Sequence, residues 1–243
     1  MKIIKLDAID STNSFLKELA QQSPLENYTV VVTNNQTKGR GQTHTIWDSQ
    51  PFKNLTFSVL IKELFVTIHY AKYISFAASL AVFDTLQKHQ IPNLSIKWPN
   101  DILSANKKIC GILVENTFRN ANIKNSIIGI GLNVNQTQFP KALKKVSSLQ
   151  LLTHKEHNLD ELLIEIISNL KNNITLLNDK KYEVLEQNYL KVLYKRNTPA
   201  MFQDANNQPF LGKITGISAT GELQIQLEDE TTRTFGIKEV TFL

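Results

Sequence analysis

The chain has 243 residues, of which 42% are hydrophobic and 20% are charged, and its formal net charge is +5. These values are those of an ordinary globular protein, which predicts a packed core in one large domain or in a domain with a small appendage. The positive excess is mild and spread along the chain. It suits an anionic small molecule as well as a nucleic acid, so charge alone selects no partner.

Cysteine content and hydropathy argue against a disulfide-bonded, a secreted or a membrane-spanning protein. Cys110 is the only cysteine, so no intrachain disulfide can form, and its apolar neighbours indicate a small buried side chain rather than a nucleophile. The apolar stretch after Met1 is too short for a signal peptide, and no apolar run reaches the ~20 residues that a membrane span needs. We therefore expect a soluble cytoplasmic protein with no membrane association.

The first part of the chain predicts a helix followed by two strands. Ser11 or Thr12 can cap a helix whose apolar residues recur at helical spacing. The β-branched run at 28–33 predicts a buried strand, and residues 54–61 predict another. Between them, residues 34–50 combine glycine with polar side chains over a length that is typical of functional loops.

The middle of the chain predicts one long helix and three strands. The helix is expected over residues 68–89, because their apolar side chains fall on one face. Strands are expected around residues 94–97, 109–116 and 126–134. The last two are apolar nearly throughout, which places them centrally in a sheet covered on both faces.

Two helices and a group of short strands complete the chain. An i, i+3, i+4 apolar stripe over residues 159–177 predicts one helix, and residues 181–193 predict another. Residues 202–243 then alternate short β-like runs with turns, which predicts a small barrel of about five strands. The predicted fold class is α+β, with domains at residues 1–196 and 197–243.

The sequence Gly39-Arg40-Gly41 lies in the predicted functional loop. Its glycines let a ligand approach main-chain N–H groups, and the guanidinium of Arg40 can bind a carboxylate or a phosphate. The Gly-Lys-Ser/Thr ending of a nucleotide-binding P-loop is absent. Taken alone, such a sequence is more often a plain turn than a ligand site.

Polar residues also follow a predicted strand in Lys97-Trp98-Pro99-Asn100-Asp101. The proline favours an extended turn, which leaves Asn100 and Asp101 at a strand exit, where ligand contacts are common. A surface turn with a solvated aspartate explains the same residues equally well.

A lysine and several glycines mark the two central strands. Lys108 precedes an apolar run that continues to Glu115, and its ammonium group either reaches solvent or is held toward an anion. Gly111 in this run, and Gly129 and Gly131 in the next strand, pack no side chain and weaken a sheet. Their positions suit a sheet against which a small bicyclic ligand lies.

Four segments, taken in order, resemble the catalytic domain of biotin–protein ligases: Asp10-Ser11-Thr12-Asn13, Gln36-Thr37-Lys38-Gly39-Arg40-Gly41-Gln42, Lys97-Trp98-Pro99-Asn100-Asp101 and Lys107-Lys108-Ile109-Cys110-Gly111-Ile112-Leu113-Val114-Glu115. The resemblance covers nearly the whole chain. It implies a mixed sheet of the class II aminoacyl-tRNA-synthetase type with flanking helices, plus a small C-terminal SH3-like β-barrel. It also implies an enzyme that makes biotinyl-5'-AMP from biotin and ATP with Mg²⁺, then acylates a lysine of a biotin carboxyl carrier protein domain.

The same resemblance implies roles for individual residues. The implied biotin-binding residues are Ser11, Thr12, Asn13, Gln36, Gly39, Arg40, Gly41, Gln42, Lys108, Gly111 and Leu113. The implied ATP-binding residues are Trp47, Asn100, Lys108 and Asn133. Arg40, Lys108 and Asp101 are the implied catalytic residues, because fixed cations must neutralise the charge that develops when a carboxylate attacks an α-phosphorus. Asp101 is also the implied Mg²⁺ ligand.

The chain departs from the family pattern at two points. Relatives often carry arginine and glycine at the fourth and sixth positions of the Gly-Arg-Gly loop, where this chain has Gln42 and His44, with Thr43 between them. This change predicts weaker retention of the acyl-adenylate, unless a protonated His44 compensates. Ser11 lies only ten residues from Met1, so we expect the monofunctional type without an N-terminal DNA-binding domain.

The histidines outside the loop are poor candidates for chemistry. His154 and His157 are three residues apart in a polar connection without a thiol or an obvious third ligand, so we expect no zinc site there. His69 and His89 fall near predicted helix ends and are expected on the surface.

Two alternatives stay open. A lipoate or octanoate ligase shares the broad fold, but such an enzyme needs a long apolar tunnel for its substrate. The Ser-Thr-Asn segment and Gln36 are polar and fit a ureido ring better. A non-catalytic biotin sensor, or a nucleic-acid binder, belongs to another class. Residues 198–243 lack the aromatic-interleaved basic patch of a strand binder, and a sensor has little reason to keep both Lys108 and Asp101. The oligomeric state, monomer or homodimer, also stays open.

Overall fold

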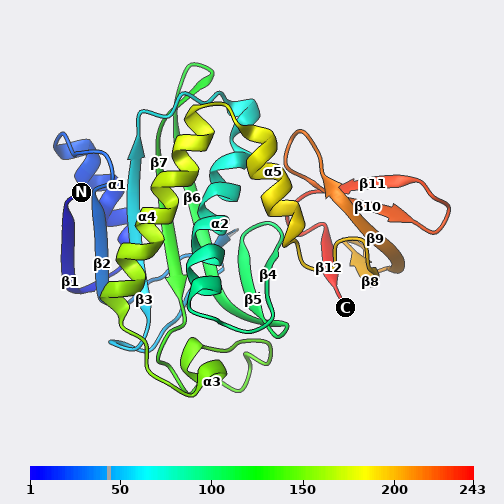
Figure 1. Cartoon of the computed structure of the whole chain (residues 1–243), viewed down its shortest axis with the longest axis horizontal. Helices are drawn as coiled ribbons and strands as arrows, with labels where there is room; N and C mark the ends of the chain where they lie inside the picture. Colours follow the sequence, from blue (N-terminus) through cyan, green and yellow to red (C-terminus); the bar gives the residue numbers. More distant parts are fainter. Residues whose placement is uncertain (43–44) are drawn as a thin grey trace.

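The computed structural model describes residues 1–42 and 45–243. Thr43 and His44, on which the prediction about adenylate retention partly rests, lie outside the described residues. A large sheet with its helices is followed by a small C-terminal sheet, and both sheets are seen in Figure 1. The predicted α+β fold class is therefore confirmed.

Seven strands form the large sheet, in the order β1-β2-β3-β7-β6-β5-β4. Their bounds are β1 Ile3–Ile9, β2 Val30–Gln36, β3 Leu55–Lys62, β4 Leu94–Lys97, β5 Asp101–Ser104, β6 Lys107–Arg119 and β7 Asn122–Leu132. β1 and β2 pair in parallel, while the other neighbours are antiparallel. The sheet is therefore mixed, and its central strands β3, β7 and β6 include the apolar runs that predicted this position.

Helices cover both faces of this sheet. α2 (Lys72–Lys88) and α4 (Leu159–Asn178) lie over one face, with α5 (Tyr182–Lys191) beside them (Figure 1). α1 (Thr12–Gln22) packs on the opposite face. Neighbouring residues of a strand point to opposite faces of the sheet, so they join different clusters. Val30 thus belongs to the main core, whereas Val31 packs with Leu16 of α1.

Five antiparallel strands form the small sheet, in the order β11-β10-β9-β8-β12. Their bounds are β8 Pro199–Asp204, β9 Pro209–Ile217, β10 Leu223–Leu227, β11 Thr232–Phe235 and β12 Val240–Phe242. Within residues 1–42 and 45–243, no ladder joins β11 to β12, so the five predicted strands are present without the full closure of a barrel. The division of the chain at residues 196 and 197 stays a prediction.

Side chains of the first part of the chain bond to the backbone of the turn between β9 and β10. The indole N–H of Trp98 donates to the carbonyl of Gly221 at 3.0 Å, and Lys72 Nζ donates to the carbonyl of Ser218 at 3.0 Å. One hydrophobic cluster also runs from the large sheet to the small one. The small sheet is therefore held against the edge of the large sheet where β4 and β5 lie.

Three short or exposed elements were not predicted. β1 alternates exposed and half-buried residues at the sheet edge, and β5 and α3 (Leu149–Thr153) span only four and five residues. A single-turn helix, η2 (Ile68–Tyr70), precedes α2 within the range predicted as one helix. None of the described helices has both the length and the hydropathy that crossing a membrane requires.

Candidate active site

A cavity of about 610 Å³ lies on the side of the large sheet that α1 covers. Its walls come from the start of α1, the loop after β2, strands β3 to β7 and residues 237–242 of the C-terminal segment. The predicted site residues on its lining are Ser11, Thr12, Asn13, Gln36, Arg40, Gly41, Gln42, Trp47, Asn100, Asp101, Lys108, Gly111 and Leu113. The fold thus collects segments that are far apart in the sequence around one space.

Buried hydroxyl and amide groups gather at the end of the cavity next to α1. Ser11 caps this helix as predicted, since its Oγ accepts a hydrogen bond from the backbone N–H of Ser14. Gln36 Oε1 accepts from both the backbone N–H and the hydroxyl of Thr12, at 2.9 and 3.2 Å. Ser58 Oγ on β3 lies 2.7 Å from Thr12 Oγ1, within hydrogen-bond distance. These bonds fix the orientation of the polar groups before any ligand arrives.

A carboxylate connects this polar end to the Gly-Arg-Gly loop. Glu115 Oε2 accepts hydrogen bonds from Asn13 Nδ2 and Arg40 Nη2, both at 2.8 Å. Asn13 Oδ1 in turn accepts from Ser58 Oγ. Glu115 belonged to the sequence motif but had no predicted role. It joins α1 and the loop across the sheet, so it holds Arg40 at the cavity.

The other end of the cavity carries several positive charges. Lys108 Nζ lies 2.7 Å from Asp101 Oδ1, and this aspartate is the one carboxylate on the described lining. Burial lowers the pKa of Lys97; Asp101 opposes this effect, while Lys108, Lys145 and Lys195 add to it. More cations than anions therefore face this region, which suits a phosphate-bearing ligand.

Trp47 lies against the glycines of the central strands. A Cβ atom at Gly131 would overlap the five-membered ring of the Trp47 indole, and one at Gly111 would lie 3.1 Å from Cζ3. Lys108 Nζ stands 5.5 Å from the centre of the Trp47 ring. Among the described residues, the buried indole N–H finds no acceptor. Part of the surface that the glycines offered to a flat ligand is thus occupied by Trp47, a contact that the sequence did not predict.

A methyl group at Gly131 tests this packing. We expect Gly131→Ala to displace the Trp47 indole toward solvent, because the added Cβ takes the place of the ring. Tryptophan emission should shift to longer wavelength while the thermal transition changes little, because Trp47 lies on a loop. Gly216→Ala is the matched control, since its Cβ would meet only the side-chain oxygen of Gln224, at 3.1 Å. An unshifted emission in Gly131→Ala would contradict the prediction.

Glycine also permits a close contact between α1 and β7. A Cβ atom at Gly129 would overlap Oδ1 of Asn13. This glycine therefore accommodates a side chain of the protein, rather than leaving open the ligand surface that the sequence suggested. The close approach brings Asn13 to the cavity.

Two predicted site residues do not reach the described lining of the cavity. Asn133 is buried, and its side chain donates to the carbonyl of Ser147 at 3.0 Å, so it secures the segment after β7. Gly39 lies behind the lining, where a Cβ would overlap the carbonyl oxygen of Trp47. Asn100 does line the cavity, and its side-chain amide donates to the carbonyl of Ile112.

The C-terminal segment forms a wall that the sequence did not identify. Ile237, Val240 and Phe242 line the cavity, and Lys97 Nζ lies 4.8 Å from the centre of the Phe242 ring. No short-range pattern could reveal these contacts, because the partners are more than a hundred residues apart. The small sheet thus completes the cavity beside the cationic residues.

Cys110 takes no part in this site. Its side chain is fully buried, and burial raises the pKa of its thiol far above the usual range. A thiol that stays protonated is a poor nucleophile. The prediction of a small buried hydrophobic side chain is confirmed.

Comparison with known sequences gives a consistent result. Residues 6–133, which are more than half of the chain, match the Biotin/lipoate A/B protein ligase family. The bifunctional ligase/repressor BirA of Bacillus spizizenii is 28% identical over 247 residues, which cover 98% of this chain and 71% of that protein. BirA of Bacillus subtilis is 34% identical over 148 residues, which cover 60% of this chain and 45% of that protein.

Solved structures agree with the sequence relatives. The biotin protein ligase from Aquifex aeolicus in complex with biotin and ATP is similar, with a TM-score of 0.82 and 26% identity. The similarity covers 100% of this chain and 98% of that one. With the family match, the order of the four motifs and the cavity that collects them, this chain belongs to the biotin/lipoate A/B protein ligase family.

Proposed function

We propose that the chain is an ATP-dependent biotin–protein ligase, which forms biotinyl-5'-AMP and then transfers biotin to a lysine of a biotin carboxyl carrier protein domain. One observation carries the proposal: a single cavity holds a buried hydroxyl and amide cluster at one end and Arg40 and Lys108 beyond it. Biotin itself has this polarity, with a ureido ring at one end and a carboxylate at the other.

The polar end supplies the selectivity for biotin in this proposal. A ureido group has two N–H donors and one carbonyl acceptor, and Ser11, Thr12 and Gln36 carry both hydroxyl and amide groups. An unmatched polar group buried there costs about 1–3 kcal/mol. At the end opposite their carboxylate, lipoate and octanoate have no hydrogen-bonding group that could pair with this cluster. The cluster therefore favours biotin over lipoate and octanoate as the substrate.

The cationic end supplies the chemistry. An oxygen of the biotin carboxylate attacks the α-phosphorus of ATP, the new O–P bond forms, and the bond to pyrophosphate breaks. Arg40 and Lys108 are the cations that neutralise the anions brought together. The acceptor lysine, as a neutral amine, then attacks the acyl carbon; AMP leaves and the amide nitrogen loses a proton. No covalent enzyme intermediate is needed, which agrees with the inert Cys110.

A Mg²⁺ ion fits the proposal through Asp101. Mg²⁺ is usually held by one or two carboxylates together with substrate phosphates, and Asp101 is the one carboxylate on the described lining. It faces Lys108, so it lies where the phosphates would meet that lysine. When bound, the ion would neutralise phosphate charge.

Pyrophosphate release tests the proposed function. The purified chain is given ATP and Mg²⁺ with biotin, lipoate or octanoate, and pyrophosphate is measured. We expect release with biotin alone. Release with lipoate or octanoate would move the function to the sister enzymes of the family. No release with any acid, together with biotin binding by calorimetry, would leave a biotin sensor.

The charge of the loop sets how long the adenylate is retained. Gln42 lines the cavity, so Gln42→Arg should add a cation near the bound anion and slow escape of the intermediate several-fold. Labelling of a bystander protein, compared with labelling of the carrier domain, measures the escape. Gln50→Arg adds the same charge outside this cavity and should have no effect. Equal labelling in both variants would contradict the prediction.

The acceptor protein and the location are part of the proposal. A carrier domain has to present its lysine at the cavity, and the exposed loop residue Ile46 on the cavity rim offers an apolar contact for it. A cytoplasmic location stays a prediction from the sequence.

A further inference from the structure

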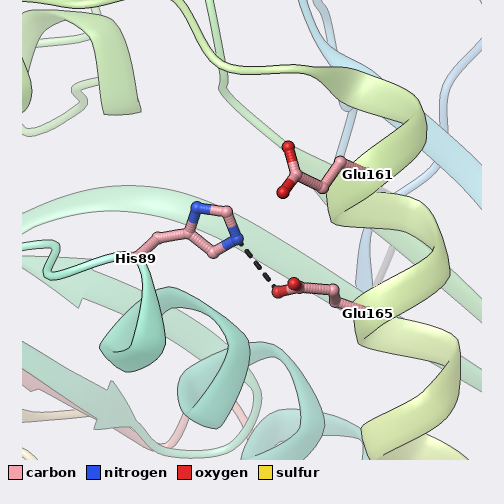
Figure 2. Close-up of side chains that lie close together, drawn as sticks. All are labelled: His89, Glu161 and Glu165. Atoms are coloured by element: carbon pink, nitrogen blue, oxygen red, sulfur yellow. Dashed lines mark hydrogen bonds and ion pairs between the residues drawn. The ribbon is translucent and has the colours of Figure 1, made fainter.

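A second group of side chains that can ligate a metal lies where the end of α2 meets the start of α4. His89 follows the last residue of α2, and Glu161 and Glu165 stand one turn apart on α4, as Figure 2 shows. One ligand atom from each of the three lies within 4.8 Å of the others. None of these residues belongs to the described lining of the active-site cavity, so the group needs its own explanation.

The packing of α2 on α4 fixes this arrangement. Asn169 Nδ2 donates to Thr85 Oγ1 at 2.9 Å, and Asn173 Nδ2 donates to the carbonyl of Ala77 at 3.1 Å. Two amide contacts at successive turns set the register of the helices. The backbone positions of the three side chains are therefore determined by buried contacts, not by a flexible loop.

The imidazole of His89 is oriented toward α4. His89 Nε2 lies 3.0 Å from Glu165 Oε2, and the ring stands edge-on to the buried ring of His157, with 6.1 Å between centroids. His89 was expected on the surface, and its side chain is in fact partly buried, with 19% of it exposed. The bond to Glu165 thus directs Nε2 toward α4.

Ion pairing explains the position of the Glu165 carboxylate but not the direction of the Glu161 carboxylate. Lys88 Nζ lies 2.6 Å from Glu165 Oε1, so Glu165 contacts an ammonium group as well as the imidazole of His89. Among the described residues, the carboxylate of Glu161 makes no hydrogen bond or ion pair, yet Figure 2 shows it turned toward the imidazole. A negative charge in the first turn of a helix is favourable, but that effect does not require this direction.

We propose that His89, Glu161 and Glu165 bind one divalent transition-metal ion of the Zn²⁺ type, with water completing the coordination. Nitrogen and carboxylate ligands lie about 2.0–2.2 Å from such an ion, and the three donor atoms, which lie within 4.8 Å of one another, reach this spacing by small side-chain rotations. An imidazole in the set favours Zn²⁺ or Ni²⁺ over Mg²⁺ or Ca²⁺. Lys88 is 69% exposed, so its ammonium group can turn to solvent when the ion binds. The bound ion joins the end of α2 to the start of α4.

Zn²⁺ titration of the full-length chain, untagged and treated with a chelator, tests the site in the absence of ATP. We expect saturable binding by calorimetry at one site and a higher thermal transition with Zn²⁺. Glu161→Gln should weaken Zn²⁺ binding at least about tenfold, since even outer-shell changes at metal sites cost this much. The Glu161→Gln substitution leaves the contacts of Glu165 with Lys88 and His89 in place.

Matched variants separate this site from others. His69→Gln removes an exposed histidine and should not change Zn²⁺ affinity, and Asp101→Asn should not change it either. His89→Gln should lose binding, and if it fails to fold, Glu161→Gln decides alone. Absence of saturable Zn²⁺ binding, or the same affinity in Glu161→Gln and in the unmodified chain, would overturn the proposal.

Discussion

Replacing Lys108 with alanine lowers the rate of biotinyl-adenylate formation by about 10²–10³-fold while biotin affinity stays nearly unchanged. Lys108 lines the cavity, and in the proposed mechanism its ammonium group neutralises the reacting phosphate, where charge develops only during the reaction. Single-turnover formation of the adenylate measures the rate, and calorimetry measures biotin binding.

An adjacent lysine provides the control for this result. Lys107 is exposed and lies outside the described lining of the cavity, so Lys107→Ala should keep full activity. Loss of the ion pair with Asp101 is a second effect of removing Lys108. Asp101→Asn breaks the same pair and keeps the lysine, so its biotin affinity measured without Mg²⁺, for which Asp101 is the proposed ligand, reports the effect of the lost pair. Equal losses of adenylation and biotin binding in Lys108→Ala would contradict the assignment of Lys108 to the reacting phosphate.

Thr12→Val weakens biotin binding by about 1–3 kcal/mol, which is roughly 5–150-fold in Kd, and leaves ATP affinity intact. Thr12 is buried on the cavity lining, where its hydroxyl is the group expected to meet the ureido ring. Valine keeps the shape of threonine but removes the hydroxyl, so the loss reports on hydrogen bonding. Calorimetric titration with biotin and with ATP measures both affinities.

The hydroxyl of Thr12 also bonds to Gln36 and Ser58, so a loss could come from internal disorder. Ser58→Ala tests this explanation, because Ser58 is buried and lies outside the described lining. We expect a smaller loss of biotin affinity in Ser58→Ala than in Thr12→Val. An unchanged biotin affinity in Thr12→Val would contradict the proposed contact between Thr12 and the ureido ring.

Much of the fold could be predicted because apolar patterns act locally. The nearly continuous apolar run of β7 and the stripe of α4 each reflect burial on known faces, so both were predicted from the sequence. β1 was missed because it is an edge strand with exposed residues, and β5 because four residues carry too little pattern. The cis peptide bond at Trp98-Pro99 had no sequence signal beyond the proline itself.

The candidate site was predicted less completely, since its geometry depends on long-range contacts. Motifs indicated Arg40 and Lys108, and the structure places both on one cavity. The pairing of Arg40 with Glu115 joins residues 75 positions apart, and nothing local indicates it. For Asn133 the family resemblance implied an ATP contact, whereas in this structure its amide donates to the carbonyl of Ser147, a partner that the sequence did not indicate.

Two of the cations that line the cavity each hold a carboxylate of the protein itself, Arg40 with Glu115 and Lys108 with Asp101. Both pairs are partly exposed, and such pairs contribute only about 0–1 kcal/mol, so a substrate anion can replace the internal carboxylate at little cost. In the proposed reaction, we expect Glu115 and Asp101 to act as counter-ions that return to Arg40 and Lys108 when AMP departs. This exchange should make product release easier than it would be from unpaired positive charges.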